Sequence, residues 1–136
     1  MTETPAGTVP ADGIVNTPSP LSVRETTERL STLIGAAGAT LFGVIDQSAE
    51  AEQAGLALRE TKLVIFGNPS AGTPVMVASP LAALDLPLKI LVWADEDGTV
   101  WMSYLDPAWL AGRHGLTGKL AAPLAAPAAL TARVLD

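Results

Sequence analysis

The sequence predicts an α+β fold in which a mixed or antiparallel sheet carries helices packed against it. Apolar, partly β-branched runs of strand length alternate along the chain with stretches of helical spacing that begin at a capping residue. One clear hairpin turn at residues 95–98 breaks this alternation, so the strict strand–helix repeat of a doubly wound Rossmann domain is not expected. A chain of 136 residues fits one domain and buries about 68% of the surface that its unfolded form exposes.

The predicted α+β domain covers residues 12–118. Residues 1–11 carry Thr, Pro and Gly with little apolar content, and we expect them to form a disordered leader. Residues 119–136 are an Ala- and Pro-rich C-terminal tail, in which a short helix carries Leu130 and Val134. With 49% hydrophobic residues and a mean hydropathy of +0.35, the composition differs strongly from that of disordered chains.

A short strand and a well-capped helix open the predicted domain. Residues 13–17 are a candidate strand that Pro18 closes. Ser22 and Glu25 have the spacing of a capping box, in which each side chain accepts from the backbone N–H of the other residue. Apolar residues then recur at helical spacing until Gly38, which stands where a C-terminal cap belongs.

Two strands and a short helix are predicted next. Residues 39–45 are apolar and partly β-branched, which is typical of a buried strand. Asp46 ends this strand and caps a helix over residues 47–54. Residues 62–66 form a second buried strand.

The middle of the chain is dense in turn-forming residues. Residues 67–74 are predicted to form a loop. Thr73 followed by Pro74 has the pattern of an N-cap and a first-turn proline, so a short helix is expected over residues 74–78. A further turn or two follows over residues 80–84.

A hairpin and a final capped helix complete the domain. Residues 88–94 and 99–104 read as strands that pair through the acidic turn at 95–98. Asp106 caps a helix that runs to about Arg113.

Composition and charge exclude several classes of function. The chain has no cysteine, so disulfides and thiolate chemistry are excluded. His114 is its only histidine, so a multi-histidine metal site within one chain is excluded as well, and we expect no metal and no cofactor. The net charge is −6, with only 8 Lys and Arg, which makes nucleic acid and acidic membrane surfaces poor partners. Apolar runs are shorter than the ~20 residues that span a bilayer, and we expect a soluble, cytoplasmic protein.

Four ionisable side chains are candidates for acid–base chemistry. Asp46, Asp106 and His114 follow or flank predicted helices, whose starts gather at one edge of a sheet. The plainer interpretation is that both aspartates are N-caps and that His114 complements a helix dipole. Lys89 stands in a strand between apolar residues, where a lowered pKa would make it a base or nucleophile, although such a lysine more often extends its ammonium group to water.

Asn68 and Trp93 are the remaining candidate ligand-binding residues. Asn68 lies in the 67–73 segment, whose glycine spacing resembles a phosphate loop but lacks the lysine, so a strand-to-helix turn is favoured. The alternative is a small-anion site at the amide groups of the helix that Thr73 opens. Trp93 belongs to an aromatic group that lines either a pocket or a subunit contact, or else a plain hydrophobic core. The members of that group are Trp93, Trp101, Tyr104 and Trp109.

Several short motifs follow one another in a fixed order over most of the chain. They are Ala54-Gly55-Leu56, Leu63-Val64-Ile65-Phe66-Gly67-Asn68-Pro69, Gly72-Thr73-Pro74, Ala83-Leu84-Asp85-Leu86-Pro87-Leu88-Lys89, Val92-Trp93, Val100-Trp101-Met102-Ser103-Tyr104, Asp106-Pro107 and Arg113-His114-Gly115. Over residues 22–116 the chain thereby resembles the domain of unknown function 302 family. The resemblance implies a compact α+β fold of the split β-α-β kind, often dimeric, and no assigned reaction. The chain departs from the family pattern at Gln47, where histidine is frequent, and at Leu105, where asparagine is frequent.

Two functional hypotheses follow, and a third stays open. The first is a homodimeric small-ligand-binding or accessory domain without catalysis, because few polar groups are expected to converge. The alternative is a small hydrolase- or isomerase-like enzyme that uses Lys89, His114, Asp46 or Asp106 in a cleft. The third is a structural role as a domain fused or bound to a larger system.

Overall fold

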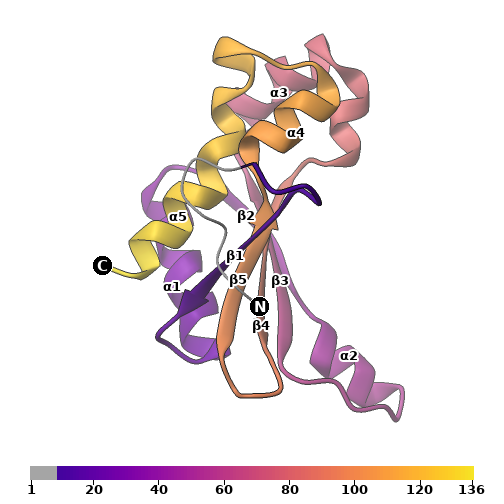
Figure 1. Ribbon diagram of the computed structural model, residues 1–136, viewed down its shortest axis with the longest axis vertical. Helices are drawn as coiled ribbons and strands as arrows, with labels where there is room; N and C mark the ends of the chain where they lie inside the picture. The colour runs from indigo at the N-terminus through magenta and orange to yellow at the C-terminus, as the bar shows by residue number, and fades with distance from the viewer. Residues whose placement is uncertain (1–8) are drawn as a thin grey trace.

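The computed structural model describes residues 9–136, which form a five-stranded sheet with helices against it (Figure 1). The strand order is β1-β5-β4-β3-β2, and every neighbouring pair is antiparallel. The predicted α+β class is therefore confirmed. The strands are β1 (Ile14–Ser19), β2 (Thr40–Asp46), β3 (Thr61–Gly67), β4 (Leu88–Ala94) and β5 (Val100–Leu105). The helices are α1 (Val23–Ala36), α2 (Gln47–Gln53), α3 (Pro69–Ala78), α4 (Pro107–His114) and α5 (Ala126–Val134), with the 3₁₀ turns η1 (Pro80–Leu84), η2 (Gly118–Leu120) and η3 (Ala122–Ala125).

The capping box predicted for the first helix is confirmed. The backbone N–H of Glu25 donates to Ser22 Oγ at 3.0 Å, and the N–H of Ser22 donates to Glu25 Oε1 at 3.3 Å. The helix buries its apolar side against the sheet, with Leu30 and Ile34 fully buried. Helices α1 and α5 contact each other and cover the same face of the sheet (Figure 1).

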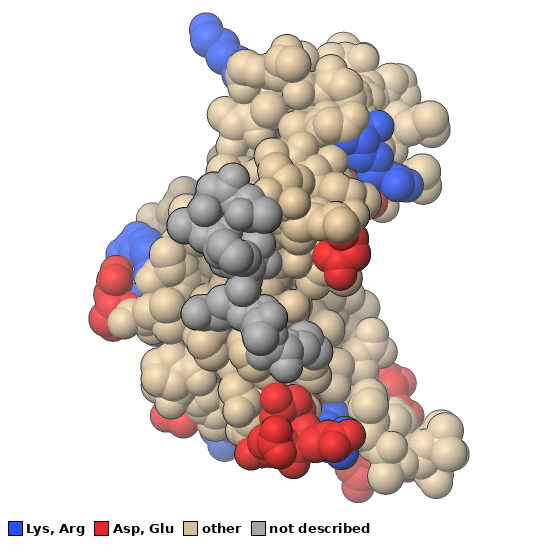
Figure 2. Space-filling view, viewed as in Figure 1, with Lys and Arg blue, Asp and Glu red and all other residues tan. Residues whose placement is uncertain are grey.

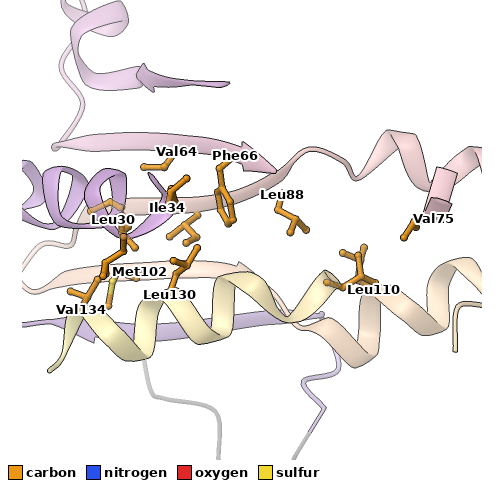
Figure 3. Close-up of a cluster of buried hydrophobic side chains, with 14 of the residues drawn as sticks. Leu30, Ile34, Val64, Phe66, Val75, Leu88, Met102, Leu110, Leu130 and Val134 are labelled. Atoms are coloured by element: carbon orange, nitrogen blue, oxygen red, sulfur yellow. The ribbon is translucent and has the colours of Figure 1, made fainter. Parts of the chain in front are cut away.

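The core lies between that helical layer and the sheet. Inward-facing side chains alternate along the central strands, as in Val64 and Phe66 on β3. Figure 3 shows these side chains facing Ile34 from α1 and Leu130 and Val134 from α5. Residues 119–136, expected as a tail with a short helix, thus carry α5 and place buried side chains in the same core.

The predicted boundaries at the N-terminus fall partly outside the structure. Of the expected 1–11 leader, residues 1–8 lie outside the described residues. Strand β1 runs through Pro18 and ends at Ser19, because β1 is an edge strand that bonds only to β5 among the described strands, and an edge tolerates a missing N–H. Within residues 9–136 no helix is both long enough and apolar enough to cross a bilayer.

Residues 39–45 were predicted to form a buried strand, and the prediction of burial is wrong. Strand β2 does form there, but it lies at the edge of the sheet and pairs only with β3, with a bulge between Leu41 and Gly43. Phe42 is 53% exposed and Ile45 is 42% exposed. Apolar composition alone does not distinguish a central strand from an edge strand, since strand order is fixed by contacts distant in sequence.

The start of the third helix also differs from the prediction. Helix α3 begins at Pro69, and its N-cap is Asn68, whose Oδ1 accepts from the N–H of Ser70 at 3.0 Å. Thr73 and Pro74 therefore lie inside the helix, and the expected loop over residues 67–74 is mostly helical. Asn-Pro satisfies the cap and first-turn rule as well as Thr-Pro does, so the rule alone did not locate the start. Thr73 therefore opens no helix, and the place given to the alternative small-anion site is wrong.

The β4–β5 hairpin and α4 form as predicted. Gly98 has φ +81° in the turn, and Asp95 Oδ1 accepts from the N–H of Thr99 at 3.0 Å. Figure 2 shows acidic residues gathered at the lower end of the molecule, over this hairpin. Asp106 caps α4 by accepting from the N–H of Trp109 at 3.0 Å, and Gly115 ends the helix with φ +64°.

Candidate functional site

Strands β4 and β5 separate at one end of the sheet. Their pairing runs from Ala94–Val100 to Leu91–Ser103, whereas β4 starts at Leu88 and β5 continues to Leu105. Between Leu88 and Ile90, β4 pairs only with β3, and at Tyr104 and Leu105, β5 pairs only with β1. A cavity of about 280 Å³, here called the β4–β5 cleft, lies at this separation. Its lining residues are Ile14, Leu63, Asp85, Leu88, Lys89, Leu91, Ser103, Tyr104, Leu105, Leu110 and Pro127.

Asp85 is the central polar residue that lines the cleft, and it is not among the candidate residues that the sequence predicts. Its Oδ2 lies 2.5 Å from His114 Nε2 and accepts from Arg113 Nε at 3.1 Å. The His114 side chain is only 7% exposed. Asp85 therefore joins the segment before β4 to the last turn of α4. Its position at the end of a short helix, before Leu-Pro, reads as a turn, and only the fold brings it to His114.

Lys89 lines the same cleft but makes a local contact. Its Nζ donates to the carbonyl of Pro87 at 2.8 Å. Asp85 also lines the cleft, so the structure brings Lys89 into one region with the carboxylate that binds His114. Leu105, one of the two departures from the family pattern, lines this cleft as well and gives it an apolar wall.

The two aspartates of the acid–base hypothesis act as caps at opposite ends of the molecule. Asp46 Oδ1 accepts from Ser48 Oγ at 2.7 Å and from the N–H of Ala49 at 2.9 Å, and these bonds hold the pKa of Asp46 below its ordinary value. Asp106 caps α4, as described above. Figure 1 places α2 and α4 at opposite ends of the sheet, so Asp46 does not join the other candidates.

Trp93 belongs to a hydrogen-bonded chain across three strands. Its Nε1 donates to Ser103 Oγ at 2.9 Å, and Ser103 Oγ donates to Asn16 Oδ1 at 2.6 Å. Trp101 instead donates to Asp95 Oδ2 at 2.9 Å. Of the aromatic group in the sequence, only Tyr104 lines one of the cavities described here, so the group does not enclose a single pocket.

A second, larger cavity lies on the helical side of the sheet. This apolar cavity has a volume of about 460 Å³ and lies between the end of β3, α3, α5 and the segment that leads into β4. Phe66, Leu88 and Leu130, which Figure 3 shows facing one another from different elements, contribute to its inner wall. Asn68, a candidate from the sequence, also lines it. The remaining lining residues are Ala37, Ala39, Phe42, Gly67, Pro69, Ala71, Gly72, Thr73, Val75, Met76, Leu86, Pro87, Pro123, Leu124, Ala126, Ala129 and Arg133.

Comparison with known proteins connects the chain to one family. The family model described as Domain of unknown function DUF302 matches residues 15–132. The crystal structure of the uncharacterized conserved protein DUF302 from Bacillus stearothermophilus superposes with a TM-score of 0.76 at 21% identity, over 93% of this chain and 98% of that one. That likeness concerns the fold.

Curated relatives carry the name of an ion channel. The "Fluoride-specific ion channel FluC 1" of Brucella suis biovar 1 (strain 1330) is 43% identical over 112 residues, which is 82% of this chain and 44% of that protein. The protein of the same name from Brucella abortus biovar 1 (strain 9-941) is 43% identical over 112 residues, and 42% of its length is matched. The chain therefore spans less than half the length of these relatives.

Proposed function

The chain belongs to the family Domain of unknown function DUF302, and we propose that it is a homodimeric, small-ligand-binding accessory domain. The observation that carries this proposal is the apolar cavity of about 460 Å³. Small-molecule sites are typically concave, mostly apolar and about 300–1,000 Å³ in volume, with a few polar groups that orient the ligand. The apolar cavity fits this description, since Asn68, Thr73 and Arg133 supply its polar side chains.

Binding is favoured over catalysis because the ionisable candidates are occupied by structural contacts. Asp46 and Asp106 cap helices, and Asp85 is held by Arg113 and His114. Lys89 donates to a backbone carbonyl. A nucleophile with an adjacent, oriented base is what catalysis of this kind requires, and these contacts do not supply one.

A cavity-filling variant tests the binding proposal. Ala129 lines the apolar cavity from α5 and is exposed, so Ala129→Trp places an indole ring at the cavity without opening the core. Ala132 is an exposed alanine on the same helix that does not line the cavity, and Ala132→Trp is the matched control. A ligand at about 100 times its Kd stabilises a protein by about 2.7 kcal/mol.

We expect a thermal-shift screen of apolar small molecules to raise the Tm of the wild type and of Ala132→Trp, and to leave that of Ala129→Trp unchanged. Decanoate and decanol serve as the first probes. No shift in the wild type with any probe, or an equal shift in both variants, would overturn ligand binding in the apolar cavity.

Strand β2 supports the homodimer. Its outer edge pairs with no other strand of residues 9–136, and Phe42, Val44 and Ile45 are exposed there. The strand holds no Lys, Arg or Pro, which protect many open edges. Its bulge lies between Leu41 and Gly43, so the regular part of the edge that can pair runs from Gly43 to Asp46. Antiparallel pairing of β2 with β2 of a second copy is self-complementary, as a two-fold dimer requires.

The dimer is tested by size-exclusion chromatography with light scattering. We expect twice the monomer mass of 13.9 kDa for the wild type and the monomer mass for Ile45→Lys. Leu84→Lys is the control, since Leu84 is an exposed leucine on η1 (73%) away from β2. A monomeric wild type, or an unchanged mass in Ile45→Lys, would contradict pairing through β2.

The likeness to the FluC proteins favours a related role, in which the domain works as an accessory part of a channel protein. The support is 43% identity to a segment that makes up 44% of the Brucella suis protein. The test is fluoride release from proteoliposomes that contain this relative, either intact or without the matching 112 residues. A release rate that changes on deletion, or that responds to decanoate only in the intact protein, supports the role. Equal release rates for the intact and the shortened protein, both with and without decanoate, contradict it.

A further inference from the structure

We propose that the ligand of the apolar cavity is an amphipathic carboxylate, with an apolar chain inside the cavity and its carboxylate at the Arg133 guanidinium. This inference rests on the proposed ligand-binding function and specifies the class of ligand. It depends on the charge, the pairing and the position of the lining residues.

Among the described residues that line the apolar cavity, Arg133 alone is charged. It is exposed, and it forms no ion pair with any carboxylate of residues 9–136. Arg24, Arg59 and Arg113 each pair with a carboxylate. Arg29 forms no ion pair among residues 9–136 either, but it does not line the apolar cavity, so Arg133 combines both properties. An arginine with unused donors at the wall of a cavity is suited to bind a planar carboxylate through its guanidinium fork.

The other lining residues limit the polar part of the ligand to one small group. Asn68 Oδ1 already accepts from the backbone N–H of Ser70 as the cap of α3, which leaves only the Asn68 amide NH₂ as a donor, and Thr73 is exposed. The remaining wall is made of Ala, Gly, Pro and larger apolar side chains such as Phe42, Met76 and Leu124. A ligand with several charged or hydroxyl groups, such as a nucleotide or a sugar, would bury those groups without partners, which costs free energy.

The position of Arg133 has a second physical consequence, which the experiment must separate from binding. Arg133 lies in the last turn of α5, where a cation also favours the helix dipole. A dipole contribution changes the stability of the free protein. It does not distinguish a carboxylate from a neutral alcohol of the same chain length.

The test is isothermal titration calorimetry at neutral pH with hexanoate, octanoate and decanoate, each below its micelle concentration, and with the corresponding alkanols. We expect the affinity to rise about fourfold for each added methylene until the chain fills the cavity. We expect each alkanoate to bind more tightly than its alkanol, and this difference to shrink at high salt, since Arg133 is exposed.

The variants assign the carboxylate to one side chain. We expect Arg133→Gln to weaken decanoate binding about fivefold and to leave decanol binding unchanged. We also expect it to remove the salt dependence of decanoate binding. Arg133→Lys is expected to restore most of the affinity for decanoate. Arg24→Gln is the control, because it makes the same change in net charge on an exposed arginine that does not line the cavity.

Failure of the inference and failure of the proposed function give different results. If alkanols bind as tightly as alkanoates and Arg133→Gln changes neither, the carboxylate assignment is overturned while ligand binding stands. If neither series binds, or if Ala129→Trp binds decanoate as the wild type does, the ligand-binding function itself is overturned.

Discussion

Asp85 is the residue through which the end of the sheet is fixed to α4. Its Oδ2 accepts from His114 Nε2 at 2.5 Å and from Arg113 Nε at 3.1 Å. Because the His114 side chain is only 7% exposed, removing Asp85 leaves a buried imidazole nitrogen without its partner. We expect Asp85→Ala to lower the free energy of unfolding by about 1–3 kcal/mol, measured by urea denaturation.

An exposed ion pair of the same geometry provides the control. Arg24 Nε donates to Glu28 Oε1, also at 3.1 Å, but the two side chains are 80% and 65% exposed. Solvent screens such a pair, so we expect Glu28→Ala to change the free energy of unfolding by less than about 0.5 kcal/mol. If Asp85→Ala and Glu28→Ala lowered the free energy of unfolding equally, the burial of His114 would not add to the stability that Asp85 provides.

Asp95 and Trp101 predict a pH dependence at the base of the hairpin. The indole N–H of Trp101 donates to Asp95 Oδ2 at 2.9 Å and lowers the pKa of Asp95 below its ordinary value of 3.8. A carboxyl with a lowered pKa stabilises the fold above pH 3.8, and this stabilisation is lost as the pH falls through the folded-state pKa. We expect Trp101→Phe to move the Asp95 titration upward, towards 3.8, in carboxyl NMR. An unchanged titration would show that the backbone donors of Thr99 and Asp97 hold the carboxylate alone.

At the scale of elements, local patterns located most helices and strands but not their surroundings. The capping box at Ser22 and the hairpin at residues 95–98 are local, because every atom that defines them lies within a few residues. The burial of β2 is not local. Residues 39–45 and 62–66 have similar apolar composition, yet β3 pairs on both sides and β2 on one, so only the strand order decides which is covered.

Helix α3 offers a direct test of which residue starts it. Asn68 Oδ1 accepts from the N–H of Ser70, whereas Thr73 is exposed within the helix. We expect Asn68→Ala to lower the free energy of unfolding by about 1 kcal/mol, and Thr73→Ala to leave it unchanged or slightly raised, as alanine favours helix interiors. Urea denaturation of the two variants checks this, and a larger cost for Thr73→Ala would return the helix start to Thr73.

At the scale of the whole molecule, the candidate site could be predicted only in part. Asn68, Lys89 and His114 were recognisable as unusual side chains in their segments, and each of them lines a cavity or binds a residue that does. Asp85 was not, because its role depends on α4, which follows much later in the chain. Both cavities arise from long-range arrangement: one where β4 and β5 stop pairing, the other where α5 returns across the sheet.

The C-terminal segment shows how far the core depends on residues after 118. Leu130 on α5 is 6% exposed and lies in the core with residues of β3 and α1, while Leu135 is 50% exposed just beyond the same helix. Leu130→Ala removes a buried side chain, which generally costs about 2–5 kcal/mol. One side of Leu130 already faces the apolar cavity, so fewer contacts are lost, and we expect about 2–3 kcal/mol by urea denaturation. Leu135→Ala is the control and is expected to cost less than about 0.5 kcal/mol. If both variants unfolded at the same urea concentration as the wild type, residues 119–136 would be an appendage, and the α5 wall of the apolar cavity would not be a fixed part of the fold.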